Sequence, residues 1–487
     1  MPRPGSWPVK RGMGRALITS ILILLAVLAA TACAPMMAQE GVERPNIILV
    51  LTDDMRKDDL EHMPRTRNLI ADQGMTFSNA FVTQANCCPS RATILRGQYP
   101  HNHGVLNNSP PKGGFPRFKE LGRENSTIAT WLNDDGYRTV LLGKYLNGYP
   151  TDDPTYIPPG WDEWYASVDS GYYDYKLNEN GTVVSYGSAG QDYLTDVLGV
   201  KAQDYVRRTV SDPAPFFMYL APAAPHHPYT PAPRHEGATP EDVRVPRHAG
   251  QFNEKDMGDK PSWARELPRL NSREVAGLDA NYRKRLNSLL AVDEMVAGLV
   301  EELDAAGELD NTYIVFTSDN GYHMGEHRLA EAKKVPYEES IRVPLVIWGP
   351  GIPAGRTTGQ FALNNDLAPT FADLGAASTP GFVDGRSLKP LFAADAPDWR
   401  TAFLVQHWFG GPGDVSIPYK AVRTSQHKYI RYSNTKEKEL YNLGKDPYET
   451  RSIHRSASES LMGGLRSRLT ALKGCAAESC REAEDGP

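Results

Sequence analysis

The sequence predicts an α/β protein with a large, mostly parallel sheet sandwiched by helices and a smaller C-terminal α+β subdomain containing an antiparallel sheet. The segment 46–51 carries a continuous apolar run, which is typical of a parallel strand buried on both faces. Strand-like and helix-like segments then alternate, which favours a sheet with helices on both faces. Beyond about residue 400 the pattern changes to short β segments, and 487 residues exceed what one small core needs.

The individual elements follow from local start and stop signals. Pro64 stands near the start and Gly74 at the end of one predicted helix, and Pro89 suits the first turn of another that runs to about Arg96. Further helices are expected over residues 126–135, 192–208, 275–306, 364–375 and 456–473. Strands are expected over residues 46–51, 75–82, 138–143, 216–220, 312–317, 343–347, 419–424 and 428–432.

The remaining stretches set the domain boundaries. Residues 230–272 are rich in Pro, charge and turn residues, so we expect a long surface excursion there. The main domain is expected over 44–395, the antiparallel-sheet subdomain over 396–475, and a tail over 476–487.

The N-terminus has the pattern of an export signal over residues 1–33. Four basic residues precede the apolar stretch Ala16–Ala32, which is short for a membrane-spanning helix, although a permanent anchor is the alternative. Cys33 follows Ala-Thr-Ala, which resembles a bacterial lipoprotein cleavage site. We therefore expect an exported protein, either a cell-envelope lipoprotein or secreted, whose one membrane contact would be a lipid anchor at Cys33.

The charge balance excludes some partners. The formal net charge is −6, and removal of residues 1–33 takes away basic residues but no acidic ones. An acidic protein is a poor ligand for nucleic acid or for an anionic membrane surface. A pocket for a small anion stays compatible with this charge, because local charge can oppose the net charge.

Cys475 and Cys480 lie close together near the C-terminus. In an exported chain this spacing favours a small disulfide loop. A metal site is the alternative, but no histidine pattern accompanies the pair.

Polar residues follow several of the predicted strands. Asp53 and Asp54 follow the first strand, and Asp319 and Asn320 follow the strand over 312–317. Ligands of such sheets bind beyond the C-terminal strand ends, so we expect these side chains to converge. Their oxygen atoms suit Ca²⁺, and less readily Mg²⁺. Taken singly, each pair would serve as a turn or helix cap.

Residues 87–91 read Cys-Cys-Pro-Ser-Arg, which resembles the sulfatase motif C-x-P-S-R. In that family the first cysteine, here Cys87, is oxidised to formylglycine, an aldehyde that hydrates and attacks sulfur. A buried pair of structural thiols is the alternative. Arg91 lies one helical turn from Cys87 and could reach both the nucleophile and the sulfate oxygens.

Three further cationic or titratable residues are candidates for the same site. Lys144 follows the strand over 138–143, and Lys333 lies in Glu-Ala-Lys-Lys. Both could neutralise sulfate oxygens, whereas lone lysines are usually surface charges. His226 is a candidate general acid for the leaving alcohol, with His227 as its neighbour and a packing histidine as the alternative.

The resemblance extends well beyond the pentapeptide. Segments similar to type I sulfatases are spread in order over roughly residues 44–470, among them 44–54, 87–92, 99–104, 143–147, 317–323 and 439–443. Within that family the chain is most similar to the N-acetylglucosamine-6-sulfatases and extracellular glucosamine-6-sulfatases, through segments such as 171–175, 192–198 and 307–314.

The resemblance implies an alkaline-phosphatase-like fold and a set of site residues. Ca²⁺ would be bound by Asp53, Asp54, Asp319, Asn320 and the modified residue 87. Arg91 would hold the hydrated aldehyde, and Lys144, His226 and Lys333 would bind sulfate and assist departure of the alcohol. Substrate contacts are expected from His101, His103, Asn147 and His323. Many sulfatases have a histidine at the position of Leu146, and Asn147 is expected to substitute for it.

The resemblance also implies a substrate and a processing partner. The substrate would be the 6-O-sulfate of glucosamine or N-acetylglucosamine units in a glycan, as in glycosaminoglycan degradation. A formylglycine-generating enzyme would act on the unfolded chain before export. The alternatives are a phosphate or phosphonate ester hydrolase of the alkaline-phosphatase superfamily, and a catalytically silent glycan-binding protein on that fold.

Overall fold

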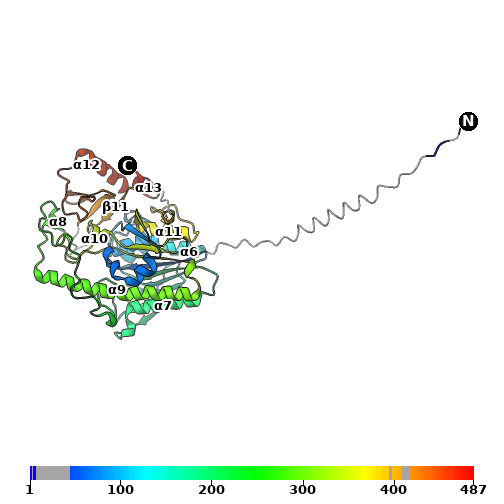
Figure 1. The fold of residues 1–487 in the computed structure, drawn as a ribbon, viewed down its shortest axis with the longest axis horizontal. Helices are drawn as coiled ribbons and strands as arrows, with labels where there is room; N and C mark the ends of the chain where they lie inside the picture. Colours follow the sequence, from blue (N-terminus) through cyan, green and yellow to red (C-terminus); the bar gives the residue numbers. More distant parts are fainter. Residues whose placement is uncertain (3, 7–43, 249, 394–397, 409–416, 487) are drawn as a thin grey trace. The chain divides into compact units, whose positions relative to one another are not determined.

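The computed structural model describes residues 1–487 except residues 3, 7–43, 249, 394–397, 409–416 and 487 (Figure 1). Most of the expected export signal, including Cys33, lies outside the described residues. Contacts divide the chain into Met1–Glu43 and Arg44–Pro487, so both predicted domains belong to one compact unit. Among the described residues, no helix has the length and apolarity to cross a membrane.

A ten-stranded sheet forms the centre of Arg44–Pro487. Its strands follow the order β10-β2-β9-β8-β1-β7-β3-β4-β5-β6. Their bounds are β1 Asn46–Thr52, β2 Met75–Phe81, β3 Arg138–Gly143, β4 Glu163–Ser167, β5 Lys176–Glu179, β6 Thr182–Ser185, β7 Phe216–Ala221, β8 Thr312–Ser318, β9 Leu345–Trp348 and β10 Arg356–Leu363. The adjacent strands β8, β1, β7, β3 and β4 all run parallel, whereas β9 is antiparallel to both its neighbours and β5 and β6 form a hairpin. The predicted α/β fold class is confirmed.

Helices cover both faces of this sheet. The α-helices described between residues 44 and 395 are α2 Pro64–Thr66, α3 Cys87–Arg96, α4 Pro100–His103, α5 Gly114–Glu120, α6 Ile128–Asp134, α7 Leu194–Thr209, α8 Ser262–Arg265, α9 Ser272–Ala306, α10 Glu338–Ile341 and α11 Leu367–Leu374. The side chains of β1 alternate between two cores: Ile47, Leu49 and Leu51 pack on the α3, α6 and α11 side, and Ile48 and Val50 on the α7 and α9 side. Figure 1 shows α7 beside the long α9.

The long helix α9 has clear end signals. The side chain of Asn271 accepts hydrogen bonds from the backbone N–H groups of Arg273 and Glu274, which caps the start. Gly307 ends the helix with a φ of 75°, a left-handed conformation that glycine adopts without a steric penalty. The helix predicted over 64–74 forms over 64–71, where the α-helical turn α2 continues directly as a π-helical segment, Arg67–Ala71.

The excursion over 230–272 is less exposed than predicted. Gln251, Glu254 and Lys260 within it are buried. The backbone N–H of Asn253 donates to Gly325, and that of His327 donates to Gln251, at 2.8 and 2.9 Å. These polar side chains are buried because the excursion packs against the loop that follows β8.

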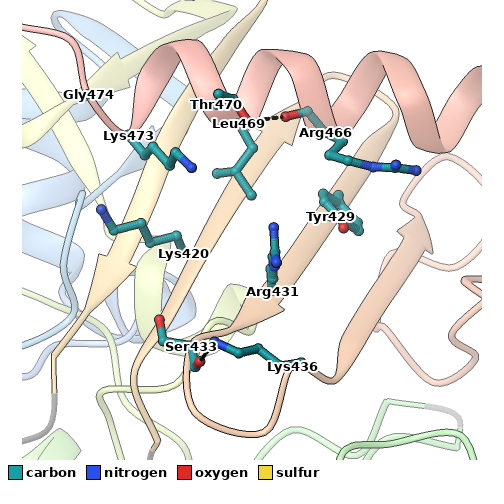
Figure 2. Close-up of a pocket in the computed structure, with 10 residues that line it drawn as sticks. All are labelled: Lys420, Tyr429, Arg431, Ser433, Lys436, Arg466, Leu469, Thr470, Lys473 and Gly474. Carbon is teal, nitrogen blue, oxygen red and sulfur yellow. Dashed lines mark hydrogen bonds between the residues drawn. The ribbon is translucent and has the colours of Figure 1, made fainter.

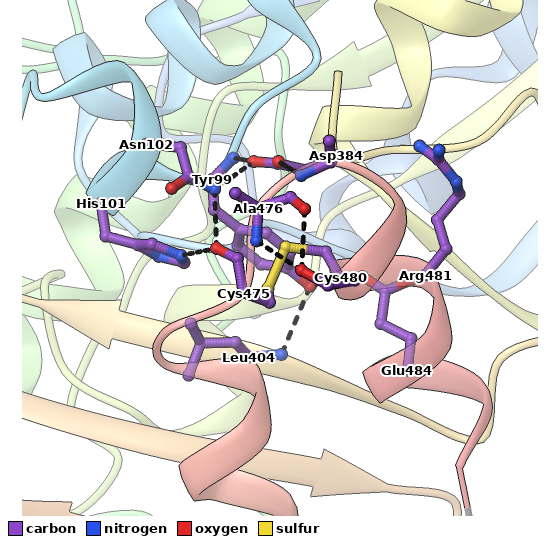
Figure 3. Close-up of a disulfide and its surroundings, with 12 residues drawn as sticks. Tyr99, His101, Asn102, Asp384, Leu404, Cys475, Ala476, Cys480, Arg481 and Glu484 are labelled. Atoms are coloured by element: carbon purple, nitrogen blue, oxygen red, sulfur yellow. Dashed lines mark hydrogen bonds between the residues drawn. A yellow bond between two sulfur atoms is a disulfide. The ribbon is translucent and has the colours of Figure 1, made fainter. Parts of the chain in front are cut away.

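The C-terminal part contains the expected antiparallel sheet, with β11 Ala402–His407, β12 Tyr419–Thr424, β13 His427–Tyr432 and β14 Lys438–Asn442. Two helices follow, α12 Glu459–Leu472 and α13 Glu478–Asp485. A disulfide joins Cys475, in the connection between these helices, to Cys480 in α13 (Figure 3).

Residues 476–487, which we expected to form a tail, include the packed helix α13. Glu484 on this helix is fully buried and accepts a hydrogen bond of 2.6 Å from the Tyr99 hydroxyl. It also lies 3.3 Å from both Arg386 and Arg400. The end of the chain is therefore anchored to the main domain, because the buried Glu484 carboxylate binds a hydroxyl group and two guanidinium groups there.

Candidate active site

The predicted strand-end residues converge at one edge of the large sheet. Asp53 and Asp54 follow β1, and Asp319 and Asn320 follow the neighbouring β8. Lys144 follows β3, and the loop after β7 carries His226. Because β8, β1, β7 and β3 are adjacent and parallel, their C-terminal ends bring these residues to one place.

Cys87 lies at the first position of α3, beside this edge. Its side chain is 1% exposed, and burial raises the pKa of its thiol to about 12. The Sγ atom is 3.6 Å from Asp53 Oδ1, 4.0 Å from Asp54 Oδ1 and 2.8 Å from Lys333 Nζ. Residue 87 is therefore close to two carboxylates and to the ammonium group of Lys333, which also pairs with Asp54.

Three cations compensate the three buried carboxylates. Lys144 pairs with Asp53 and Lys333 with Asp54. The Arg91 guanidinium donates from Nε to Asp319 Oδ2 at 2.8 Å and from Nη1 to the Lys144 carbonyl at 2.8 Å.

The pKa values of the carboxyl groups follow from this pairing. Burial opposes ionisation of Asp53, but Lys144 and the other cations outweigh it and hold the pKa well below its usual range. The pKa of Asp54 is also lowered, because Lys333 outweighs burial. For Asp319, burial and the nearby charge of Asp53 dominate, so its pKa is raised.

The donor set fits a hard divalent cation. Ligand atoms of Asp53, Asp54, Cys87 and Asp319 lie within 4.8 Å of one another, and all four residues are buried. The Oδ1 atom of Asn320 is buried with no hydrogen-bond partner, while its amide nitrogen donates to Asp54 Oδ1 at 2.6 Å. An unpartnered amide oxygen beside three carboxylates is the chemistry expected of a Ca²⁺ or Mg²⁺ site.

The loop that carries Asp54 has an unusual backbone conformation. Asp54 has a φ of 67°, in the left-handed region. Its N–H donates to Asp319 Oδ1 at 3.1 Å, and its carbonyl accepts from Arg285 Nη2 at 2.5 Å. Arg285 is fully buried on α9 and also donates to the Pro225 carbonyl at 3.1 Å, next to His226. Sequence reasoning missed Arg285, since nothing in the pattern of α9 distinguishes a buried arginine from an exposed one.

A cleft of about 640 Å³ opens beside this group. Its lining includes Asp53, Lys144, Tyr145, Asn147, Tyr149, Tyr172, His226 and His227. The Nε2 atom of His226 lies 3.7 Å from Asp54 Oδ2, and its side chain is 39% exposed, so it faces both the acidic group and solvent. Asn147 Oδ1 is buried with no partner. The Tyr172 hydroxyl, also missed from the sequence, donates to the His226 carbonyl at 2.7 Å.

Three histidines that we expected to contact substrate lie elsewhere. The Nε2 atom of His101 forms a hydrogen bond of 3.0 Å with the Cys475 carbonyl, beside the disulfide (Figure 3). His103 is buried against Thr93 Oγ1 at 3.0 Å, and His323 is buried with Ser340 Oγ at 2.9 Å. None of the three lines the cleft. Their side chains take part in packing, because each finds a polar partner in the interior.

Comparison with known proteins explains this arrangement. The family model described as "Sulfatase" matches residues 45–377, which include Cys87, Lys144, Lys333 and the four oxygen donors. The chain is a member of the sulfatase family. A second model, "N-sulphoglucosamine sulphohydrolase, C-terminal", matches residues 325–474. This sulfatase therefore hydrolyses sulfate esters.

Curated relatives cover most of the chain. The N-acetylglucosamine-6-sulfatase of Homo sapiens is 37% identical over 91% of this sulfatase and 86% of the human protein. The N-acetylglucosamine-6-O-sulfatase of Bacteroides thetaiotaomicron is 30% identical over 89% of this sulfatase and 87% of the bacterial protein.

Solved structures agree with the fold. A structure described as a complex with its substrate D-glucosamine-2-N,6-O-disulfate has a TM-score of 0.75 and 28% identity, over 88% of this sulfatase and 97% of that chain. The phosphonate monoester hydrolase of Agrobacterium radiobacter has a TM-score of 0.68 at 22% identity, over 88% of this sulfatase and 95% of that chain, which shows a common fold.

Proposed function

We propose that this sulfatase removes the 6-O-sulfate from N-acetylglucosamine or glucosamine units of a glycan. The observation that carries the proposal is the group formed by Cys87, Lys333 and the three carboxylates, of which Asp53 lines the cleft, in a chain 36–37% identical to N-acetylglucosamine-6-sulfatases. The cleft is lined by tyrosines beside polar groups, a lining suited to the apolar face and hydroxyls of a sugar ring.

Residue 87 is proposed to act as formylglycine. When present, this group supplies a hydrated aldehyde, one hydroxyl of which attacks sulfur while the other later allows sulfate to be expelled. Because the Cys87 side chain is 1% exposed in the folded chain, a formylglycine-generating enzyme is proposed to act on the unfolded chain, before export. Export itself is proposed from the N-terminal charged and apolar pattern.

Asp53, Asp54, Asp319 and Asn320 are proposed to hold Ca²⁺. When bound, the cation would neutralise charge on a sulfate oxygen and orient it toward residue 87. The side chains themselves have separable tasks. Arg91 has no exposed surface, so it is proposed to fix Asp319 and the Lys144 carbonyl in place.

The remaining side chains are proposed to bind and protonate. Lys144 and Lys333 are 20% and 13% exposed, so their ammonium groups can turn toward a sulfate in the cleft. His226 is the group at the mouth of the site that can carry a proton to the leaving alcohol. Asn147, with its unpartnered Oδ1, is proposed to accept a hydrogen bond from the sugar.

The test combines peptide mass spectrometry of residue 87 with sulfate release. We expect an aldehyde at residue 87, a thiol at Cys88, and release of sulfate from N-acetylglucosamine 6-sulfate but not from glucosamine 2-N-sulfate. A faster reaction with a phosphonate monoester would contradict the proposal in favour of phosphoester chemistry. Binding of the sugar with an unmodified thiol and no turnover would instead indicate a silent glycan-binding protein.

A further inference from the structure

A second concave surface lies on the C-terminal sheet, between the strands β12 and β13 and the end of α12 (Figure 2). It measures about 450 Å³ and shares no lining residue with the active-site cleft. We call it the basic groove. Its lining is Lys420, Tyr429, Arg431, Ser433, Lys436, Arg466, Leu469, Thr470, Lys473 and Gly474.

The charge of the basic groove differs from that of the chain. Five of its ten lining residues are Lys or Arg and none is acidic, whereas the whole chain has a formal net charge of −6. Of these five, Arg466 has an ion pair among the described residues, at 3.5 Å from a Glu459 side chain that is 93% exposed. A pair this exposed is worth little, so the positive charge is largely uncompensated.

The sheet geometry places two of these cations against each other. Lys420 and Arg431 are directly opposite in the antiparallel β12–β13 pair. Like charges at such positions lower stability. Lys473 adds further repulsion at Lys420. The pKa of the Lys420 side chain is lowered mainly by burial and to a smaller extent by the charge of Lys473. The fold thus carries an unfavourable arrangement of charge that a bound anion would relieve.

The spacing of the cations suits an extended ligand with several anionic groups. Arg466 and Lys473 are seven residues apart on and just beyond α12, which corresponds to about 10 Å along the helix. Hydroxyls of Ser433 and Thr470 lie among the cations, and Leu469 supplies an apolar floor. Cations interleaved with hydroxyls match a linear sugar chain that bears sulfate groups at intervals.

We propose that the basic groove binds a sulfated polysaccharide at a distance from the site of hydrolysis, and so holds a polymeric substrate on the enzyme. The choice of a sulfated glycan over another polyanion rests on the proposed function. The groove would bind the polymer without a covalent step. It would raise the affinity for a polymer above that for a single sugar, because a polymer held at the groove reaches the active site in an effectively intramolecular step.

The experiment compares the full chain with two triple variants. In the groove variant, K420Q, R431Q and K473Q remove three cations. In the control variant, K255Q, R273Q and K445Q remove the same charge at exposed positions outside the groove and the cleft. Binding of heparin is measured over a range of salt concentrations, together with hydrolysis of N-acetylglucosamine 6-sulfate and the thermal midpoint.

We expect the groove variant to bind heparin at least tenfold more weakly, with a shallower dependence on salt, while the control variant changes less than threefold. Both variants should hydrolyse the monosaccharide at the rate of the unaltered enzyme. The thermal midpoint of the groove variant should not fall, since the substitutions remove repulsion.

Three results would overturn the proposal. Heparin binding could weaken equally in both variants, it could weaken in neither, or the unaltered enzyme could bind duplex DNA or anionic vesicles through the groove more tightly than it binds heparin. Failure of the proposed function would give a different combination of results. If no form of the enzyme hydrolyses N-acetylglucosamine 6-sulfate but heparin binding still depends on the groove, the activity proposal fails and the groove proposal stands.

Discussion

At the residue scale, the two adjacent cysteines occupy different environments although both are buried. Cys87 contacts Lys333 and the carboxylates of the site. Cys88 packs in the hydrophobic core on the α3 side of the sheet, and its backbone N–H donates to Asn108 Oδ1 at 2.9 Å. One position along a helix therefore separates a side chain that contacts the polar site from one that packs in the core.

This contrast predicts unequal effects of two matched substitutions. C87A should lower kcat by a factor of about 10³ or more, because it removes the proposed nucleophile. C88A should keep activity within about tenfold and lower stability by about 1 kcal/mol through the lost packing. Sulfate release and chemical denaturation of both variants measure this. Retention of activity in C87A would contradict the role of residue 87.

Arg285 is a positioning residue that ties two site loops together. It binds the carbonyl of Asp54 on one loop and that of Pro225 on the other, and lies 3.7 Å from the buried Asp59 carboxylate. R285M should lower the free energy of unfolding by about 3 kcal/mol, because it leaves buried polar groups unpaired. It should also lower kcat, since Asp54 and His226 lose their support.

The neighbouring exposed residue gives the control for Arg285. K284M should change neither stability nor kcat measurably. R285K should restore part of the stability, because it keeps the charge near Asp59, but it cannot reach both carbonyls as a guanidinium does. A normal kcat in R285M would contradict the positioning role, because it would mean that other contacts hold the loops that carry Asp54 and Pro225.

At the scale of elements, the excursion over 230–272 holds the loop that carries Lys333. Glu254 on the excursion contacts His327 Nδ1 at 2.6 Å and Lys260 Nζ at 3.3 Å. Burial raises the pKa of Glu254 to about 8, above its ordinary value of 4.5. Burial also lowers the pKa of His327 to about 3, so the pair is neutral at pH 7.

This shift predicts how stability depends on pH. The folded state binds the Glu254 proton more tightly than the unfolded state, so between pH 4.5 and 8 this group makes stability fall as pH rises. The slope from one such proton is at most about 1.4 kcal/mol per pH unit. Below pH 6.5 the lowered pKa of His327 contributes a slope of the opposite sign, so the effect of Glu254 is isolated above it. E254Q, which mimics the neutral acid, should flatten the slope between pH 6.5 and 8 in chemical denaturation.

The exposed Glu236 provides a matched comparison for Glu254. E236Q should leave the slope unchanged, as it lies on the same excursion but outside the buried contact with His327. A slope in E254Q as steep as in the unaltered protein would mean that Glu254 is ionised in the folded state.

At the scale of the whole molecule, one buried site gathers residues from segments between Asp53 and Lys333. Its three carboxylates lie at the ends of adjacent strands, so bound Ca²⁺ would link β1 to β8. Removal of divalent metal with a chelator should abolish sulfate release and lower the thermal midpoint by a few degrees. Added Ca²⁺ should restore both, because a ligand that binds the folded state stabilises it.

The metal-dependent change should disappear in a variant of the site. D53N is expected to lose the Ca²⁺-dependent rise in thermal midpoint, whereas D310N, at the turn before β8, should keep it. Restoration by Mg²⁺ but not by Ca²⁺ would contradict the assignment of the cation.

Much of this organisation could be read from the sequence, for reasons that differ between elements. The buried parallel strands β1, β7 and β8 are marked by apolar runs that need no partner to be recognised. The strands β4, β5, β6 and β10 were missed, because they carry no long apolar run and depend on the neighbours they pair with. The hairpin β5–β6 did leave a signal, the turn residues Asn180-Gly181, which predict such a connection.

The sequence by itself determined which chemical groups meet at the site. A C-terminal strand end lies at a fixed edge of a parallel sheet, so Asp53, Lys144, His226 and Asp319 had to converge once the strands were recognised. Only the tertiary structure decided which histidines face the cleft, since the hydrogen bonds that hold His101, His103 and His323 elsewhere form only in the folded chain. The same holds for Arg285 and for the basic groove: a charged side chain has the same local signature on a solvated face and in a buried contact, and long-range packing alone distinguishes the two.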